Sequence, residues 1–501
     1  MAKEVEHQEN EISPVIDWEV LVETVQQHEE SYIKDCILFC FVLPSRYQFT
    51  KDVLVWQWIA KAEDEMIEKK CTQFFESLLS LDCIVTSGYD HFVGQTMYEV
   101  GDKMAVLLQN QHLEPTYLRY LNSKQSGLAK IEHLSLDFTG LESLNFGVLK
   151  QCCRLQTLII HGWSGPKIQH LPHDLFLEMK DLKILNLSRT DIEELPSSIE
   201  NAEGLRYLDM SETPVRWLPE CICRFSNLQT LKLDGCLSLD GLPMSTSELT
   251  NLRHLVLDVV HQLQSMPEGI GQLSKLQTLG AFLVSEDGCS RIRELKGMNQ
   301  LKGSLRVVNL ENVATKEEAA EAALCNKRDL KAIELQWGDI REEKNREEEM
   351  ILESLQPPWG IRDLKILFYS GGRLPSCLVP LGELPSLKTL GIVENNEIVR
   401  IDRHFCSKRS QASGDRRVVF PKLEKLSFDS FSRRETWTGL EEEDLPNLQS
   451  LSIDNCPRLV HLLLLSHMKS LVHMEISCCR ELSCFPTDGL PIRLESLMND
   501  D

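Results

Sequence analysis

Apolar residues recur along most of the chain in the pattern LxxLxL, at intervals of about 24 residues. The first copy consists of Leu155, Leu158 and Ile160. Further copies begin at Leu182, Leu205, Leu228, Leu252, Leu387, Leu423, Leu448 and Leu471. The alternation of apolar and polar residues at the end of each copy predicts a short strand with its apolar side chains on one face. One such unit cannot bury that face alone, so the pattern predicts a stack of repeats.

The spacing of the copies indicates which kind of stack they form. The second apolar residues of four successive copies are 23, 23 and 24 residues apart, at Leu185, Leu208, Leu231 and Leu255. This spacing is typical of leucine-rich repeats, which are about 20–29 residues long. We therefore expect an α/β fold in which residues 121–501 form a leucine-rich-repeat solenoid with a curved parallel sheet on its concave face. Insertions near 339–350 and 402–418 are charged and lack an apolar period, so we expect solvated loops there.

The first 120 residues have a different character. Residues 1–30 are polar and acidic, and we expect a lead-in that is partly disordered. Residues 31–120 predict a small winged-helix-like domain, because their pattern indicates three helices, a hairpin and a further helix. The predicted helices are 32–43, 51–62 and 71–81, the hairpin strands are 83–86 and 91–93, and the last helix is 97–108. Thr50 is expected to cap the second helix.

Charge narrows the range of partners. The net charge of the 501-residue chain is −23, whereas a nucleic-acid-binding protein needs a basic surface to neutralise phosphates. We therefore expect no nucleic-acid partner, although winged helices often bind DNA. The first residues lack the apolar core of a signal peptide, and no apolar stretch reaches the roughly 20 residues that span a membrane. A cytoplasmic protein without a membrane span is the expectation.

The 17 cysteines are expected to be free thiols, as is usual in proteins that are not secreted. Cys236, Cys456 and Cys479 each follow the second apolar residue of their repeat by five positions. Repeats of this class place asparagine or cysteine there, in the turn that leaves the strand. We therefore interpret these cysteines as structural turn residues, not as redox or metal-binding groups.

Four segments carry a family resemblance. They are CILFCFVLPSRYQF (36–49), LVWQWIA (54–60), FFESLLSL (74–81) and TMYEVGDKMA (96–105). In this order, ahead of a repeat array, they resemble the CFLYCSLFPxDYxF, LIxLWIA, YFxELLSRSL and MHDLxHDLA motifs of plant nucleotide-binding leucine-rich-repeat disease-resistance proteins (NLRs, of the coiled-coil type). The resemblance covers roughly residues 31–501.

The sequence also departs from the family pattern, at the MHD motif and at the P-loop. The His and Asp of the MHD motif, which contact bound ADP in the family, correspond to Tyr98 and Glu99 after Met97, so that this position is degenerate. The alternative is that Tyr98 is only an aromatic residue on a helix face. No segment matches the P-loop GxxxxGK[ST] that would hold ADP or ATP phosphates. We therefore expect the carboxyl-terminal portion of an NLR, without the nucleotide-binding domain and with no cofactor of its own.

A binding site in such a solenoid is expected on the outward strand positions. The candidate residues there are Tyr207, Asp209, Lys232, Asp234, His254, Asp258, Glu334, Asp429, Asp454 and Glu475. Their acidic balance predicts either an electronegative binding face or a face that is merely solvated. No GxSxG or HExxH motif and no CxxC pair occurs, so we expect neither a catalytic nor a metal site.

Together these features predict a non-enzymatic recognition or regulatory protein of plant innate immunity that binds another protein through its repeats. The resemblance implies three kinds of partner: a pathogen effector, a guarded host protein, or the nucleotide-binding module of an NLR acting in trans. Two alternatives remain open, a substrate adaptor of a ubiquitin ligase and a non-functional truncated NLR.

Overall fold

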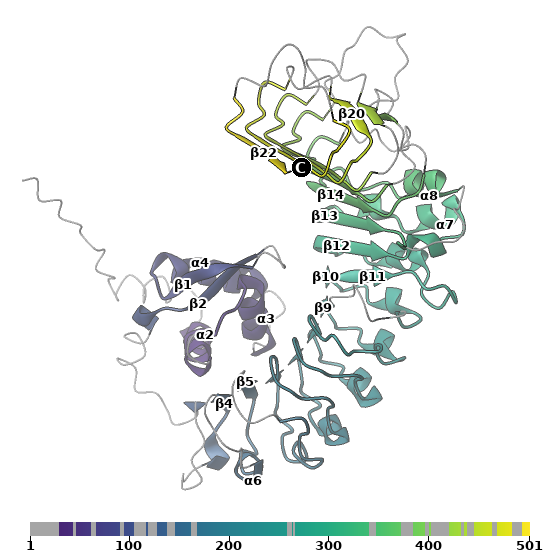
Figure 1. Ribbon diagram of the computed structural model, residues 1–501. Helices are drawn as coiled ribbons and strands as arrows, with labels where there is room; N and C mark the ends of the chain where they lie inside the picture. The colour runs from purple at the N-terminus through teal and green to yellow at the C-terminus, as the bar shows by residue number, and fades with distance from the viewer. Residues whose placement is uncertain are drawn as a thin grey trace, which may run out of the picture. The chain divides into compact units, whose positions relative to one another are not determined.

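The computed structural model of the protein describes residues 30–43, 47–61, 67–90, 95–104, 117–118, 128–137, 146–161, 168–257, 263, 266–339, 347–371, 384–395, 400–401, 420–431, 435–437, 445–462, 468–482 and 493–500 (Figure 1). The chain divides into two compact units. The first comprises residues 1–167, 172–190 and 201–208, and the second comprises 168–171, 191–200 and 209–501. Residues on both sides of position 120 belong to the first unit, so the division into units does not test the predicted domain boundary there. That boundary stays a prediction.

The N-terminal module of the first unit contains three helices and an antiparallel hairpin. They are α2 (Glu30–Val42), α3 (Lys51–Lys61), α4 (Glu68–Ser80), β1 (Ile84–Asp90) and β2 (Gln95–Val100). The three predicted helices are thus confirmed to within a few residues. Thr50 Oγ1 accepts a hydrogen bond from the Val53 amide at 3.4 Å at the start of α3, as expected for a capping residue. The assignment of this module as a winged helix stays a prediction.

The predicted helix from residue 97 is wrong at its start, because Met97, Tyr98 and Glu99 lie in strand β2. The amide and carbonyl of Tyr98 are both bonded to Phe49, at 2.8 and 2.9 Å. A helix would need those two groups for its own hydrogen bonds. Residues 102–104 are helical. Residues 91–93, predicted as a hairpin strand, lie outside the described residues, as do residues 105–108.

The repeats begin in the same unit. Strands β3 (Tyr117–Leu118), β4 (His133–Asp137), β5 (Thr157–His161) and β6 (Ile184–Asn186) pair in parallel, in sequence order. A short helix, α6 (Phe146–Leu149), lies between β4 and β5 in the chain. Strand β7 (Tyr207–Asp209) contains the border between the two units. These strands are short, from two residues in β3 to five in β4 and β5.

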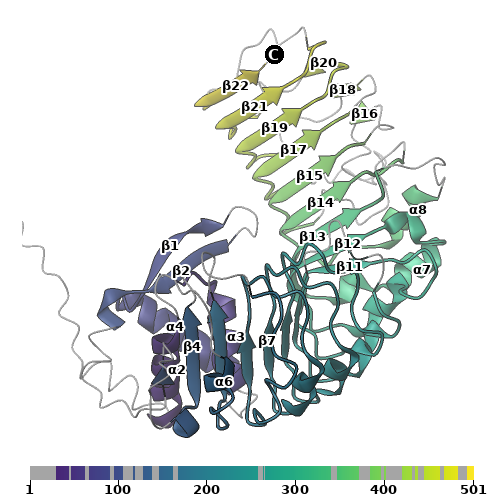
Figure 2. The same cartoon turned by 60° about the horizontal axis from the view of Figure 1, so that its bottom comes forward.

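The second unit holds the longer run of repeats. Strands β8 (Thr230–Lys232), β9 (His254–Val256) and β10 (Thr278–Leu279) pair in parallel. A nine-stranded parallel sheet follows, which Figure 2 shows as a stack. Its strands are β11 (Ala281–Leu283), β12 (Lys302–Val308), β13 (Asp329–Gln336), β14 (Asp363–Leu367), β15 (Thr389–Val393), β17 (Lys425–Asp429), β19 (Ser450–Asp454), β21 (His473–Ser477) and β22 (Ser496–Asp500). A small sheet contains β16 (Arg400–Ile401), β18 (Glu435–Trp437) and β20 (Leu459–Leu462).

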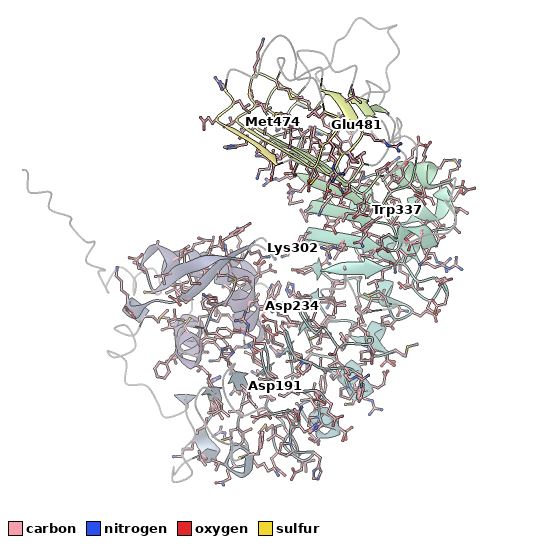
Figure 3. The ribbon with its side chains drawn as sticks, in the orientation of Figure 1. Asp191, Asp234, Lys302, Trp337, Met474 and Glu481 are labelled. Carbon is pink, nitrogen blue, oxygen red and sulfur yellow. The ribbon has the colours of Figure 1, made fainter. Side chains whose placement is uncertain are left out.

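The leucine ladder forms the core, as predicted. In every copy of the pattern the three apolar residues are buried, from Leu155 to Ile476. Met474 and Trp337, both labelled in Figure 3, are 1% and 0% exposed. Parallel pairing keeps the ladder residues of neighbouring strands opposite one another, for example Leu426 beside Leu451. The fold is therefore an α/β leucine-rich-repeat solenoid.

The first insertion is only partly a loop. Residues 340–346 and 402–419 lie outside the described residues, but α8 (Glu348–Ser354) begins within the predicted 339–350 insertion. Glu348 is fully buried there, and its Oε2 accepts hydrogen bonds from the Ser370 amide at 3.0 Å and the Ser370 hydroxyl at 2.9 Å. The expectation of a solvated loop is wrong for this part. Helix α7 (Lys316–Glu321) precedes it in the chain.

A common turn follows five strands of the nine-stranded sheet. Its first residue adopts a left-handed backbone, at Phe368, Glu394, Ser430, Asn455 and Cys478, with φ between 47° and 59°. The next residue can donate a hydrogen bond to a carbonyl. Asn395 Nδ2 donates to Tyr369 O at 2.6 Å, and the Cys456 thiol to Asp454 O at 3.2 Å. The turn role predicted for Cys236, Cys456 and Cys479 is consistent with this arrangement, since all three thiols contact backbone carbonyls.

Candidate binding face

Outward positions in the first unit are covered by the chain itself. Ile159, Ile184 and Tyr207 are fully buried and belong to the same apolar cluster as the N-terminal module, which contributes Phe39 and Trp58. Sequence analysis placed Tyr207 on an exposed binding face, and this is wrong. Burying a tyrosine ring against an apolar module removes a large apolar surface from water. This part of the sheet is therefore an internal interface.

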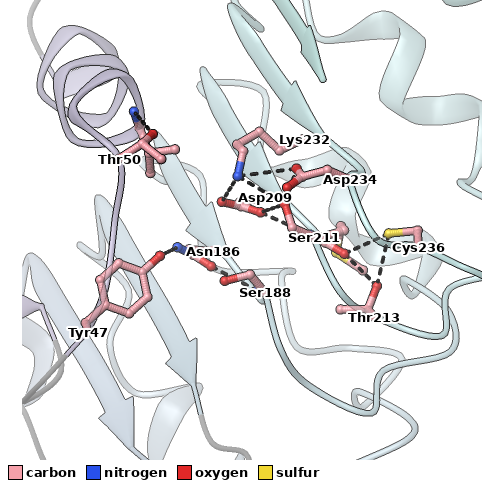
Figure 4. Close-up of polar contacts among 12 residues, drawn as sticks. Tyr47, Thr50, Asn186, Ser188, Asp209, Ser211, Thr213, Lys232, Asp234 and Cys236 are labelled. Carbon is pink, nitrogen blue, oxygen red and sulfur yellow. Dashed lines mark hydrogen bonds and ion pairs between the residues drawn. The ribbon is translucent and has the colours of Figure 1, made fainter. Parts of the chain in front are cut away.

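Polar contacts accompany this interface. Asn186 Nδ2 donates a hydrogen bond to the Tyr47 hydroxyl at 3.0 Å, and Asn186 Oδ1 accepts one from the Ser188 amide at 2.9 Å (Figure 4). The Tyr47 ring also meets His161 edge to face, with ring centroids 5.3 Å apart. Neither Ile184 nor Asn186 was among the predicted site residues. Their signal was available in the sequence, because Ile159 and Ile184 are apolar at positions where later repeats have serine, lysine or aspartate.

A buried charged network occupies the outward positions of the next two repeats, in the second unit. Lys232 Nζ lies 3.4 Å from Asp209 Oδ2, 3.3 Å from Asp234 Oδ1 and 3.2 Å from Ser211 Oγ (Figure 4). Asp209 is 1% exposed and Lys232 8%. Burial alone would raise the pKa of Asp234, but Lys232 and the Ser211 hydroxyl together hold that pKa below its usual value. Asp209 and Lys232 are thus structural, and their prediction as exposed binding residues is wrong.

His254 is also buried, at 3% exposure, with Nδ1 3.1 Å from Thr278 Oγ1. Burial lowers its pKa well below the ordinary value, and the nearby positive charges of Lys302 and Arg253 add to this. A neutral, buried imidazole cannot serve as an exposed binding residue, so this prediction is corrected as well. Asp258 lies outside the described residues.

The remaining candidates share one surface, which we call the open face: the outward side chains of β13, β14, β15, β17, β19 and β21. Along these strands buried residues alternate with partly or fully exposed ones, except at Gly391 and at Lys331 and Ala332. Glu334, Asp429, Asp454 and Glu475 lie on the open face, in the predicted register. Strand pairing sets Asp429 beside Asp454. Their role in binding stays a prediction.

The open face and the neighbouring strand β12 together carry both signs of charge. Arg306 Nε lies 2.7 Å from Glu334 Oε1 across β12 and β13, and Lys365 on β14 is exposed. Sequence analysis missed both cations, although SLRVV (304–308) and DLKIL (363–367) show the same alternation as the other strands. The predicted acidic column is therefore interrupted at this end of the sheet.

A more strongly acidic region lies at the ends of β15, β17 and β19. Within the described residues, no lysine, arginine or histidine nitrogen lies within 4.0 Å of the Asp429 or Asp454 carboxylate. Asp429 accepts a hydrogen bond from the Ser430 hydroxyl at 2.7 Å, and Asp454 accepts one from the Ser477 hydroxyl. Partial burial raises the pKa of Glu394, and the charges of Asp429 and Asp339 raise it further. We call Glu394, Asp429 and Asp454 the acidic cluster.

The predicted nucleotide position is part of the hairpin. The ring of Tyr98 packs edge to face on Phe75, with centroids 5.1 Å apart, which agrees with a packing role for this aromatic residue. The expectation that the degenerate position Met97, Tyr98 and Glu99 binds no ADP stays a prediction. In the part of the chain that the structure describes, no group of three His, Cys, Asp or Glu side chains could hold a metal ion.

Comparison with known proteins gives this geometry a family context. The family model described as R13L1/DRL21 LRRs matches residues 292–407. Two relatives from Arabidopsis thaliana, a disease resistance protein and disease resistance RPP13-like protein 1, are 35% and 30% identical over 85% and 90% of this chain. Disease resistance protein RGA2 of Solanum bulbocastanum is 28% identical over 91% of it. The chain is a homologue of plant disease-resistance proteins.

This chain spans 32% of the length of the first Arabidopsis relative and 46% of the length of each of the other two relatives. Among solved structures, a leucine-rich-repeat protein of Leptospira interrogans matches with a TM-score of 0.47 and 23% identity, covering 73% of this chain and 84% of that one. An internalin from Listeria monocytogenes matches with a TM-score of 0.43 and 16% identity, covering 74% and 87%. In the part of this chain that the structure describes, no helix is both long and apolar enough to cross a membrane.

Proposed function

We propose that this chain is a recognition module of plant innate immunity that binds a protein partner through the open face of its nine-stranded sheet. The partner is a pathogen effector, a guarded host protein, or the nucleotide-binding module of an NLR in trans. The module acts in the cytoplasm, catalyses no reaction and holds no ADP or ATP of its own. The first repeats are reserved for the N-terminal module, and the later repeats bind the partner.

One observation carries this proposal. The two stretches of outward positions differ in chemistry: Ile159, Ile184 and Tyr207 are buried in an apolar cluster, whereas Lys365, Lys425 and Glu475 are exposed on the open face. Rigid parallel strands hold exposed side chains at fixed spacings of about 4.8 Å between strands. Such a preorganised surface binds a protein partner without first ordering its own side chains and loops.

The acidic cluster supports a partner with a basic surface. Carboxylates without a cation neighbour favour the approach of positive charge, chiefly by raising the association rate. The effect is screened over about 8–10 Å at physiological salt, so association is expected to weaken as salt rises. No specific observation favours a ubiquitin-ligase adaptor.

The test is a charge reversal on the acidic cluster. Asp429→Lys with Asp454→Lys should slow association with a partner identified by proximity labelling in plant cells by on the order of tenfold at low salt, and by less at high salt. Surface plasmon resonance with the purified full chain measures the rates. The matched control is Glu203→Lys with Glu268→Lys, two exposed residues outside the sheets that give the same change in net charge.

The two variants separate specific from general electrostatics. Equal slowing by both would mean that only the net charge matters. Unchanged association in the Asp429→Lys, Asp454→Lys variant would place the binding surface elsewhere. Circular dichroism confirms that both variants remain folded.

A further inference from the structure

Two cysteines occupy the same turn position in consecutive repeats. Strands β19 and β21 pair with Asp454 opposite Ser477, and a cysteine follows each of these residues by two positions. The two thiols have equivalent contacts, since Cys456 Sγ lies 3.2 Å from Asp454 O and Cys479 Sγ lies 3.3 Å from Ser477 O. Neighbouring strands are about 4.8 Å apart, inside the range of about 4.4–6.8 Å between the Cα atoms of disulfide-bonded cysteines.

The pKa of Cys479 depends on its neighbour Cys456. A hydrogen bond from Cys456 lowers the pKa of Cys479 to about 7, against the opposing effect of partial burial. Cys456 is buried, whereas Cys479 is partly exposed. The thiolate is the nucleophilic form of cysteine, so a partly exposed thiol that ionises near neutral pH is reactive.

Cys236 shows that the turn position alone does not create this reactivity. It occupies the same position in an earlier repeat, but its neighbour there is Thr213, whose Oγ1 lies 3.7 Å from Cys236 Sγ. Burial raises the pKa of Cys236 to about 11. The same turn therefore holds an inert thiol beside threonine and a reactive one beside cysteine. A second cysteine at the equivalent turn of the neighbouring strand also supplies a resolving thiol.

We propose that Cys456 and Cys479 form a peroxide-reactive dithiol that closes reversibly into a disulfide between consecutive repeats. The Cys479 thiolate attacks one oxygen of the peroxide, the O–O bond breaks, and a sulfenic acid and hydroxide form. The Cys456 sulfur then attacks the Cys479 sulfur, the S–O bond breaks, and water leaves with the Cys456 proton. Two thiols thus lose two electrons to one hydrogen peroxide, giving a disulfide and two waters. This property goes beyond the proposed function and needs no binding partner.

The wild-type chain provides the first test. The full chain is treated with hydrogen peroxide at pH 7, its remaining thiols are alkylated, and peptides are mapped by mass spectrometry. The expected product is a peptide pair linked through Cys456 and Cys479 in the monomer, which a dithiol reductant reverses. Cys236 should remain unlinked. A sulfenic or sulfinic acid on Cys479 with Cys456 still free, or linkage only through the exposed Cys478, would overturn the proposal.

The second test separates the two roles of Cys456. In Cys456→Ser the hydroxyl still donates a hydrogen bond, so Cys479 should keep its alkylation midpoint near pH 7 but form a dimedone-trapped sulfenic acid instead of a disulfide. In Cys456→Val no donor remains, and the alkylation rate of Cys479 at pH 7 should fall by on the order of tenfold, as for a thiol with the ordinary pKa of about 8.5. Equal rates in Cys456→Ser and Cys456→Val would contradict the proposal. Iodoacetamide kinetics across pH 5–10 measure both, with thermal melts as the folding control.

Discussion

The Tyr47 hydroxyl accepts a hydrogen bond from Asn186 Nδ2 at 3.0 Å, although the two residues are 139 positions apart. Tyr47 belongs to the N-terminal module and Asn186 to strand β6. The bond is buried and lies beside an apolar cluster that both parts of the chain share. The module and the first repeats are therefore expected to unfold together.

Removing the Tyr47 hydroxyl tests this link. Tyr47→Phe leaves the buried Asn186 amide without its acceptor, and an unsatisfied buried donor costs about 1–3 kcal/mol. Denaturant melts should show this loss in free energy of unfolding. Tyr89→Phe is the matched control, because Tyr89 is 54% exposed and its hydroxyl can bond to water. Similar melts for the two variants would contradict the assigned interface.

The Lys232 network predicts an unequal pair of substitutions. Asp209→Asn leaves Lys232 with the Asp234 carboxylate, so we expect a cost of about 1–3 kcal/mol. Lys232→Met leaves the buried Asp209 carboxylate and the half-buried Asp234 carboxylate without this cation, so we expect the larger loss of about 3–5 kcal/mol. Equilibrium denaturation at pH 7 gives both values. The reverse order, or two costs below about 0.5 kcal/mol, would show that the network is solvated.

His133 predicts a pH dependence of stability. Burial lowers its pKa to about 2, and the charges of Lys61 and Lys183 contribute. The unfolded chain takes up a proton near pH 6.5 that the folded chain does not bind, so stability is full above that pH and falls below it. The loss approaches about 1.4 kcal/mol per pH unit for this residue. Melts of wild type and His133→Gln at pH 7 and pH 5 measure the difference, which should shrink in the variant.

Glu394 predicts a pH dependence of stability with the opposite sign. Its pKa is raised by partial burial and by Asp429 and Asp339, so the folded chain binds a proton more readily than the unfolded one. Ionisation of Glu394 therefore destabilises the fold as pH rises through its folded pKa. Glu394→Gln should stabilise the chain at pH 7 and make no difference well below the ordinary pKa of glutamate, about 4.3. Thermal melts of wild type and Glu394→Gln at pH 7 and pH 3 test this prediction. The same difference in stability between the two proteins at both pH values would contradict it.

The sequence predicts the repeat register well because the ladder obeys one strict period. Leu208 and Leu426, for example, are buried as their place in LxxLxL requires, and the outward set Lys425, Ser427 and Asp429 follows by alternation. Helices α3 and α4 were predictable for a similar reason, since each has a continuous apolar face next to a clear boundary.

The sequence does not predict whether an outward side chain is exposed, because periodicity carries no information about which part of the chain packs over that face. Tyr207 and Asp209 are successive outward residues of one strand in the predicted orientation, yet both are buried, one in an apolar cluster and the other beside a lysine. The Met97 segment was misassigned because its pattern suits a helix, whereas the main chain of Tyr98 pairs with Phe49, 49 positions away in sequence. Long-range pairing of this kind leaves no local signature.

The turn that follows the later strands has a consequence for engineering the array. Phe368, Glu394, Ser430 and Cys478 hold a left-handed backbone without being glycine or asparagine, a conformation that costs an ordinary residue about 1–2 kcal/mol. This conformational cost recurs in successive repeats, so it does not make any one repeat less stable than its neighbours. Asparagine or glycine at Phe368 and Cys478 offers a way to stabilise the array one turn at a time, without changing the acidic cluster or the hydrogen bond that it accepts from Ser430.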